Sequence, residues 1–93
     1  IPDCSNVCGI TGFMKVAKMA EDYSLKVHSH GMQELHANVL GAVANRGYVE
    51  FHSFPIYQYT TEPLKVKNGY LDVCGNPGTG VEFDWDKLKK YQQ

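Results

Sequence analysis

The stretch "KVHSHGMQELHANVL" (Lys26–Leu40) decides the fold class, because it passes from a β-like pattern to a helical one within a few residues. Alternate side chains of a strand face opposite sides, and residues 25–29 separate apolar from polar residues in this way. One face holds Leu25 and Val27, and the other holds Lys26, His28 and His30. The stretch therefore predicts a short strand that is followed closely by a helix.

Helical periodicity flanks this strand on both sides. Apolar residues at spacings of three and four predict one helix over residues 12–23 and another over residues 32–44. The apolar face of the first consists of Phe13, Val16, Ala17, Ala20 and Tyr23, and that of the second of Met32, Leu35, His36, Val39, Leu40 and Val43. Asn45-Arg46-Gly47 ends the second helix, and residues 48–51 predict a second strand. Short strands that alternate with helices are typical of parallel β-α units, so we expect an α/β fold.

The last third of the sequence has a different character. Residues 62–73 predict a β-hairpin, because Asn68-Gly69 tolerates the positive φ angles of a tight turn. The loop "CGNPGTG" at residues 74–80 lacks the strand-to-helix context of a phosphate-binding loop. Asp84 is suited to N-cap a short terminal helix that extends through Tyr91.

Composition argues against several function classes. The net charge is −1 and the nine basic residues do not cluster, so we expect no nucleic-acid partner. No run of about 20 apolar residues occurs, so no membrane span is expected, and no signal peptide is evident. Three cysteines at uneven spacing favour free thiols in a reducing compartment, and we expect a cytoplasmic protein.

The predicted parallel strands are too few to form a domain. Parallel sheets are buried on both faces, and a complete β-α barrel needs about 250 residues. The 93 residues supply roughly a third of that length. We therefore expect the chain to be a portion of a larger protein.

Three ionisable residues lie at the expected ends of successive strands. His30 ends the first predicted strand, Glu50 lies near the end of the next, and Asp3 precedes the first helix. In β-α barrels the strand ends at one face build the active site. From the residues alone, however, Asp3 could simply cap a turn, and His30 and Glu50 could be ordinary strand-end or surface groups.

A zinc site is another interpretation of this region. Enough nitrogen and sulfur ligands are present in Cys4, Cys8, His28, His30 and His36. The cysteines flank an apolar segment rather than a knuckle, and the histidines lack the spacing of a zinc finger. We therefore do not favour structural zinc.

Four blocks of the sequence, in the same order, resemble the C-terminal part of the mandelate racemase branch of the enolase superfamily. These blocks are "IPDCSNVCGITGFMKVAKMAE", "HSHGMQELHANVLGAV", "GYVEFH" and "NPGTGVEFD". The family places an Asp, a His and a Glu after three successive strands, and Asp3, His30 and Glu50 match at spacings of 27 and 20 residues. The resemblance implies that residues 1–58 are the end of a (β/α)₇β barrel, from the end of strand six to strand eight. It also implies that residues 59–93 return to an N-terminal capping domain.

The resemblance also implies roles for these residues. His30 would be the general acid/base, Asp3 would orient its ring, and Glu50 would donate a hydrogen bond to a substrate carboxylate. Mg²⁺ would stabilise the enediolate, with its ligands upstream of this segment. His52 is a further candidate for the substrate pocket, His28 for the barrel interior, and His36 for the packed face of its helix.

The expected function is a Mg²⁺-dependent dehydratase of sugar acids that acts on a small carboxylate substrate. A racemase or epimerase of the same family is the first alternative. A non-catalytic fragment that binds a partner through exposed sheet edges is an alternative of another class. We expect residues 1–93 to be inactive alone, to need the remainder of the barrel and capping domain, and to belong to a homo-oligomer.

Overall fold

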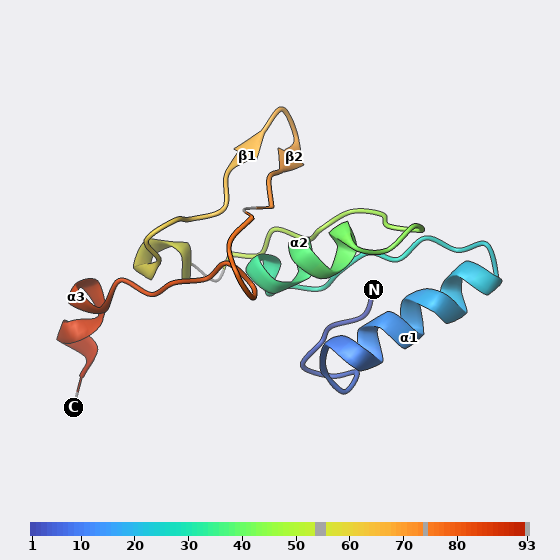
Figure 1. The fold of residues 1–93 in the computed structure, drawn as a ribbon, viewed down its shortest axis with the longest axis horizontal. Coiled ribbons are helices and arrows are strands. Elements are labelled where there is room, and N and C mark those ends of the chain that lie inside the picture. Colours follow the sequence, from blue (N-terminus) through green and yellow to red (C-terminus); the bar gives the residue numbers. More distant parts are fainter. Residues whose placement is uncertain (54–55, 74, 93) are drawn as a thin grey trace.

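A computed structural model describes residues 1–53, 56–73 and 75–92 of the chain. The helices in the first range are α1 (Gly9–Asp22) and α2 (Gln33–Gly41). The remaining elements are the 3₁₀ helix η1 (Ile56–Tyr59), strands β1 (Val66–Lys67) and β2 (Tyr70–Leu71), α3 (Trp85–Leu88) and the 3₁₀ helix η2 (Lys89–Tyr91). The radius of gyration is 14.3 Å, above the value of about 12 Å for a compact domain of this length. Figure 1 shows why: α1 lies at one end of an elongated molecule and α3 at the other, with α2 between them.

Helix α1 begins at Gly9, three residues before the predicted start at residue 12. A tight turn precedes it, in which the Asp3 carbonyl accepts from the backbone N–H groups of Asn6 and Val7. This turn folds back onto the helix so closely that a Cβ on Gly12 would overlap the Val7 carbonyl oxygen. Gly12 therefore allows the turn to pack against α1, which a helical periodicity cannot reveal.

The predicted apolar face of α1 is confirmed only in its centre. Phe13 and Ala17 are buried and Ala20 is half-buried, whereas Val16 is 37% exposed and Tyr23 is 76% exposed. The helix ends at Asp22, because the N–H groups of Tyr23 and Leu25 both turn back to the Ala20 carbonyl. The exposed apolar residues of this helix lie on faces that residues 1–93 do not cover.

Helix α2 is shorter than the predicted range of 32–44. It ends at Gly41, where the N–H groups of Ala42 and Val43 bond three residues back instead of four. Its apolar face packs against α1 in a single core. The buried members of this core are Cys4, Phe13, Ala17, Val27, Val39, Leu40 and Val43.

Three extended segments run side by side. The central segment, residues 27–30, pairs with the segment that follows α2. Val27 forms a parallel bridge with Arg46, and the Ser29 N–H donates to the Tyr48 carbonyl at 3.1 Å. On the other side, the His30 N–H donates to the Pro2 carbonyl at 3.2 Å. Because N–H groups alternate in direction along an extended chain, residues 27–30 lie between the other two segments.

The predicted strands over residues 25–29 and 48–51 are therefore only partly right. Their parallel direction is confirmed, but only the single bridge forms, and it lies at Arg46 rather than within residues 48–51. The ladder is interrupted at residues 47–48, because the Ser29 N–H donates to the Tyr48 carbonyl where a regular parallel ladder would use Gly47. The pairing therefore shifts by one residue here, and the Tyr48 N–H donates to His28 Nδ1 at 2.8 Å.

The C-terminal segment, residues 56–73 and 75–92, follows its sequence signals closely. Asn68 and Gly69 have φ angles of 53° and 78°, and they connect β1 to β2 as an antiparallel hairpin. Asp84 caps α3 by accepting from the Lys87 N–H at 3.3 Å. The cap is confirmed, and the hairpin predicted over residues 62–73 is confirmed in its centre, where β1 and β2 pair. The predicted loop at residues 74–80 is confirmed over residues 75–80, and Cys74 lies outside the described residues.

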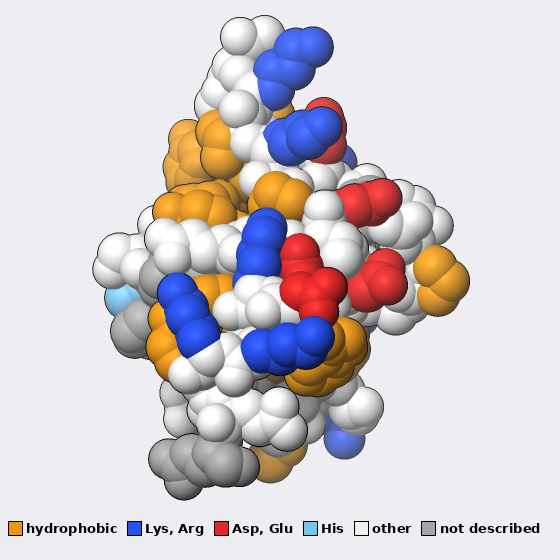
Figure 2. Space-filling view, turned by 90° about the vertical axis from the view of Figure 1, so that its left-hand side faces the viewer, with side chains coloured by type: hydrophobic (Ala, Val, Ile, Leu, Met, Phe, Trp, Pro, Cys, Tyr) orange, Lys and Arg blue, Asp and Glu red, His pale blue; other side chains and the backbone are white. Residues whose placement is uncertain are grey.

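The two ends of the C-terminal segment pair with each other. Thr60 and Phe83 form an antiparallel bridge, and the Asp84 N–H donates to the Tyr59 carbonyl at 2.7 Å. Figure 2 shows this end of the molecule, where acidic and basic side chains are intermixed on the surface. Pairs such as Lys89–Asp86, at 2.8 Å, join these charges within the terminal helices.

None of the helices in the described ranges is long and apolar enough to cross a membrane.

Candidate active site

The structure brings Asp3 and His30 together. His30 Nδ1 lies 3.1 Å from Asp3 Oδ2, across a separation of 27 residues in the sequence. An ionised carboxylate only accepts hydrogen bonds, so Nδ1 carries the proton and donates it. The tautomer of the neutral ring is thereby set, and Nε2 is the nitrogen that can accept or release a proton. The side chain of His30 is 56% exposed while that of Asp3 is 12% exposed, so the buried group orients the accessible one.

Asp3 is held as an anion by its own turn. Its Oδ1 accepts from the Ser5 backbone N–H and from Ser5 Oγ, each at 2.9 Å. The backbone N–H of Ser5, followed by the hydrogen bond from His30, lowers the pKa of the Asp3 carboxyl below its ordinary value. Both donors favour the charged form. Asp3 therefore remains a hydrogen-bond acceptor for His30 well into the acidic range.

Glu50 lies beside the segment that carries His30. Its Oε2 accepts from the Gly31 N–H at 2.7 Å, which places the carboxyl group next to the residue that follows His30. A hollow of about 310 Å³ is lined by both the segment that carries His30 and the segment that carries Glu50. It is lined by Ile1, His28, Ser29, His30, Tyr48, Val49 and Glu50. The sequence-predicted residues His30 and Glu50 thus share one open cavity.

His52 lies next to His30. The centroids of the two rings are 6.3 Å apart, and the ring planes are nearly perpendicular at 73°. The backbone of His52 is fixed by the amide of Gln33, which donates to the His52 carbonyl at 3.2 Å and accepts from its N–H at 3.3 Å. Gln33 is 1% exposed. The sequence analysis missed Gln33, since a glutamine in the first turn of a helix gives no signal of a long-range contact.

The other two histidines have structural contacts. His28 is half-buried, bonds to the Tyr48 N–H and packs so closely against Gly47 that an added Cβ there would overlap its ring. His36 is fully buried, as predicted for the packed face of its helix, and stacks near Phe13 with ring centroids 5.4 Å apart. His28 lines the same hollow as His30, whereas His36 is not among its lining residues.

The candidate zinc ligands do not form a metal site within the described part of the chain. Among residues 1–53, 56–73 and 75–92, no group of three or more His, Cys, Asp or Glu side chains could hold a metal ion. Cys4 is buried and Cys8 is exposed, and both are free thiols. Burial raises the pKa of the Cys4 thiol above its ordinary value.

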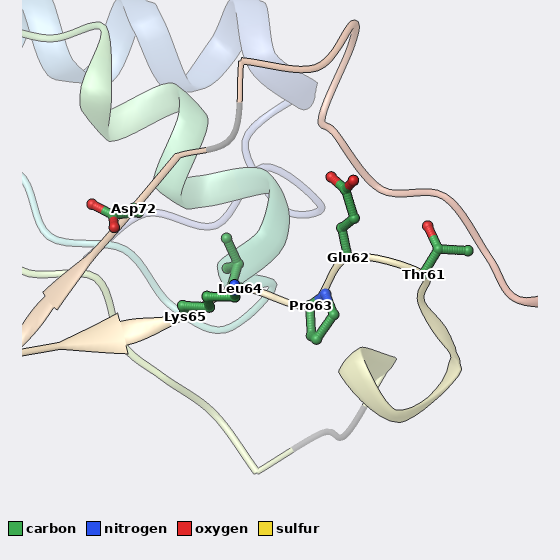
Figure 3. A pocket seen from close by; sticks show the side chains of 6 residues that line it. All are labelled: Thr61, Glu62, Pro63, Leu64, Lys65 and Asp72. Atoms are coloured by element: carbon green, nitrogen blue, oxygen red, sulfur yellow. The ribbon is translucent and has the colours of Figure 1, made fainter.

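A second hollow lies beside the hairpin, away from these residues. Its volume is about 500 Å³, and Figure 3 shows the six residues that line it. They are Thr61, Glu62, Pro63, Leu64, Lys65 and Asp72. Glu62 is already bonded to Asn76 at 2.6 Å. Since none of the predicted site residues lines this hollow, it is not a part of the candidate site.

The family model described as enolase C-terminal domain-like matches residues 1–87 of the chain. The chain belongs to this family. The resemblance inferred from the sequence is thus confirmed, and the fold is that of the C-terminal part of enolase-superfamily proteins.

Curated relatives of this enolase C-terminal domain-like chain act on sugar acids. The chain is 39% identical over 87 residues to 3,6-anhydro-alpha-L-galactonate cycloisomerase of Streptomyces coelicolor, covering 94% of this chain and 24% of the relative. It is 26% identical over 98 residues to D-xylonate dehydratase of Haloferax volcanii, covering 97% of this chain and 24% of the relative. The chain therefore spans about a quarter of the length of the relatives that it matches.

Solved structures of the superfamily also superpose on most of this chain. A racemase from Streptomyces coelicolor A3(2) with bound magnesium superposes with a TM-score of 0.86 at 37% identity, over 96% of this chain and 24% of the racemase. L-Talarate dehydratase from Polaromonas sp. JS666, complexed with Mg and L-glucarate, superposes with a TM-score of 0.80 at 31% identity. That match covers 89% of this chain and 23% of the dehydratase.

Proposed function

We propose that this chain is part of a dehydratase that removes water from a sugar acid, an aldonate or an aldarate. The observation that carries the proposal is the pair formed by Asp3 and His30 at 3.1 Å, with Glu50 on the adjoining segment of the same hollow. The dehydratase relatives, one of them with L-glucarate bound, support this substrate class.

The position of the chain in the whole protein is part of the proposal. Residues 1–58 would form the end of a (β/α)₇β barrel, from the end of strand six to strand eight, and residues 59–93 would return to a capping domain. The order of the three extended segments supports this arrangement. So do large apolar residues that remain exposed in residues 1–53, among them Leu25 at 60% and Phe51 at 46%, because parallel sheets are covered on both faces.

His30 would transfer the proton in the reaction. A base removes the α-proton, the electron pair passes into the carboxylate as an enediolate, and the β-hydroxyl leaves as water with a proton from His30 Nε2. The resulting enol tautomerises to a 2-keto-3-deoxy acid. In the alternative assignment, His30 Nε2 is itself the base that removes the α-proton. In both cases the donor bond from Nδ1 to Asp3 keeps the ring oriented.

Glu50 and His52 would bind the substrate. Glu50 uses Oε2 for the Gly31 N–H, so Oε1 is the oxygen that would, when protonated, donate to a substrate carboxylate. His52 would line the pocket from the side, since its ring lies edge-on to that of His30. Substrate hydroxyl groups suit such a polar lining.

Magnesium is bound in the neighbouring solved structures, but the described residues of this chain do not supply a site for it. We therefore propose that its ligands come from chain outside residues 1–93. Bound there, the ion would stabilise negative charge on the enediolate. The contribution of this chain is then proton transfer and substrate binding.

A racemase or epimerase is the second candidate function, favoured by the match to the magnesium-bound racemase. Racemisation needs acid/base groups on both sides of the α-carbon, and His30 would supply one of them. The two reactions differ in outcome, because a racemase exchanges the α-proton with solvent and releases no water from the substrate.

The test is a screen of the full-length protein with Mg²⁺ against a panel of aldonates and aldarates, read by formation of a 2-keto-3-deoxy acid. Repeating the screen in D₂O detects α-proton exchange without dehydration, which identifies a racemase instead. The same screen on residues 1–93 alone is expected to give no turnover.

The matched variant is His30→Asn. Its amide nitrogen can still donate to Asp3, but nothing replaces Nε2, so we expect kcat to fall by about 10²–10⁴-fold. Thermal unfolding of the variant is expected to match the wild type. Full activity of His30→Asn would rule out the proposed role of His30.

A further inference from the structure

The buried ring of His36 connects the two segments that carry the candidate acid/base pair. The backbone N–H of Cys4 donates to its Nε2 at 3.0 Å, and its Nδ1 lies 2.6 Å from the Gly31 carbonyl. Cys4 follows Asp3, and Gly31 follows His30. One side chain thus bonds to the residue after each member of the pair.

These two bonds fix the protonation of the ring. Nε2 accepts from a backbone N–H and therefore carries no proton, so Nδ1 holds the proton and donates it to the Gly31 carbonyl. Asp3 Oδ1 lies 3.9 Å from Nε2, but without a proton on that nitrogen this approach is not an ion pair. His36 is neutral and acts on Asp3 through the backbone.

Gly31 extends the connection to the third candidate residue. Its carbonyl accepts from His36, while its N–H donates to Glu50 Oε2 at 2.7 Å. The peptide groups around Gly31 therefore lie between a fully buried ring on one side and the Glu50 carboxyl on the other. A change in the position of Gly31 would move His30 relative to both Asp3 and Glu50.

We infer that His36 is a positioning residue, which sets the distance between Asp3 and His30 by bonding the Cys4 N–H and the Gly31 carbonyl at the same time. Packing by itself would require only a ring of the right shape next to Phe13. The use of both nitrogens, each on a different segment, is what a purely apolar residue cannot reproduce. The effect on turnover rests on the proposed function, whereas the effect on geometry does not.

The geometric test uses crystal structures of the full-length protein. In His36→Phe both bonds are lost while the ring shape is kept, and we expect the Nδ1–Oδ2 distance between His30 and Asp3 to exceed hydrogen-bond range. In His36→Gln the amide supplies one acceptor and one donor, and we expect the pair to remain bonded. If His36→Phe does not fold, His36→Asn replaces it, since its amide can reach Gly31 but not Cys4.

Leu40→Ala is the matched control, because Leu40 is 2% exposed on the same helix and lies in the same core. This variant is expected to lower the unfolding temperature and to leave the Asp3–His30 distance unchanged. Two results would overturn the inference: a bonded pair in His36→Phe, or in His36→Asn where that variant replaces it, or an equally separated pair in Leu40→Ala.

The kinetic test uses the same variants. We expect His36→Phe to lower kcat by about 10²-fold with KM unchanged, because a misplaced acid/base group affects the chemical step rather than binding. His36→Gln should recover most of that loss, and Leu40→Ala should keep the wild-type kcat. A wild-type protein that is inactive on every sugar acid would contradict the proposed function, and the crystal structures would still decide the role of His36.

Discussion

Residues 1–53 and the C-terminal segment are stabilised in different ways. The first region has a buried core and holds all but one of the buried polar side chains, whereas Thr60 is the only buried residue among 56–73 and 75–92. In the first region, bonds such as Cys4 to His36 span 32 residues. In the second, a turn and a helix cap form from residues close in sequence. The comparison teaches that the candidate site depends on tertiary contacts, while the hairpin turn and the helix cap of the segment after it depend on local chemistry.

The largest expected effect comes from the core of the first region. Phe13→Ala removes a fully buried ring, and we expect it to lower the free energy of unfolding of the full-length protein by about 3–5 kcal/mol. Chemical denaturation measures this change. Tyr70→Ala, at a hairpin residue that is 77% exposed, should cost less than about 0.5 kcal/mol. An equal loss in both variants would reveal that the hairpin is buried by chain outside residues 1–93.

The next effect concerns the contact between His28 and Gly47. Gly47→Ala places a methyl group where the His28 ring lies, so we expect a loss of about 1–3 kcal/mol in unfolding free energy. Gly75→Ala is the control, because an added Cβ there meets no atom within 4 Å. Thermal melts of both variants test the contrast, and equal midpoints would show that His28 can move away at no cost.

The cap of α3 predicts a smaller effect in the second region. Asp84→Ala removes the side-chain oxygen that accepts from the Lys87 N–H, and loss of an N-cap costs about 1 kcal/mol. Asp84→Asn serves as a control, because its side-chain oxygen can still accept from the Lys87 N–H. Hydrogen exchange of the amides in α3 would detect local fraying, which should appear only in Asp84→Ala.

The smallest effect is the pH dependence that Asp3 contributes. Its pKa is lowered in the folded protein by the Ser5 N–H and by His30, so it stabilises the fold above its ordinary value of 3.8. This contribution is lost as the pH falls through the folded-state pKa. The difference in melting temperature between wild type and Asp3→Asn should therefore be constant near neutral pH and shrink below about pH 4. A difference that grows in acid would contradict the direction of the shift.

Much of the C-terminal segment could be predicted because its signals are local. Asn68-Gly69 and Asp84 act on atoms within a few residues, so the hairpin turn and the cap follow from the sequence. In the first region the helices were identified but their limits were not. The start of α1 depends on the turn at residues 3–8, and α2 ends early at Gly41. The strands were shorter than expected, because the pairing with residues 27–29 shifts by one residue at Gly47 and Tyr48.

The candidate site likewise has some residues that could be predicted from the sequence and others that could not. The spacing of Asp3, His30 and Glu50 could be found by resemblance, but the hydrogen bonds of Gln33 and His36 could not. A glutamine on a helix and a histidine on an apolar face have the same patterns whether they pack or bind distant backbone groups. The distinction depends on which groups the fold brings within about 3 Å.

By itself the sequence determined the alternation of helices and extended segments, the hairpin turn, the cap of α3 and the family to which the chain belongs, since these depend on local chemistry or on a sustained pattern. Only the tertiary structure decided where the elements begin and end, how Asp3 meets His30 across 27 residues, and why His36 is buried between their segments. The physical reason is that a buried N–H or carbonyl must find a partner somewhere, and the partner is chosen by the packing of the whole chain.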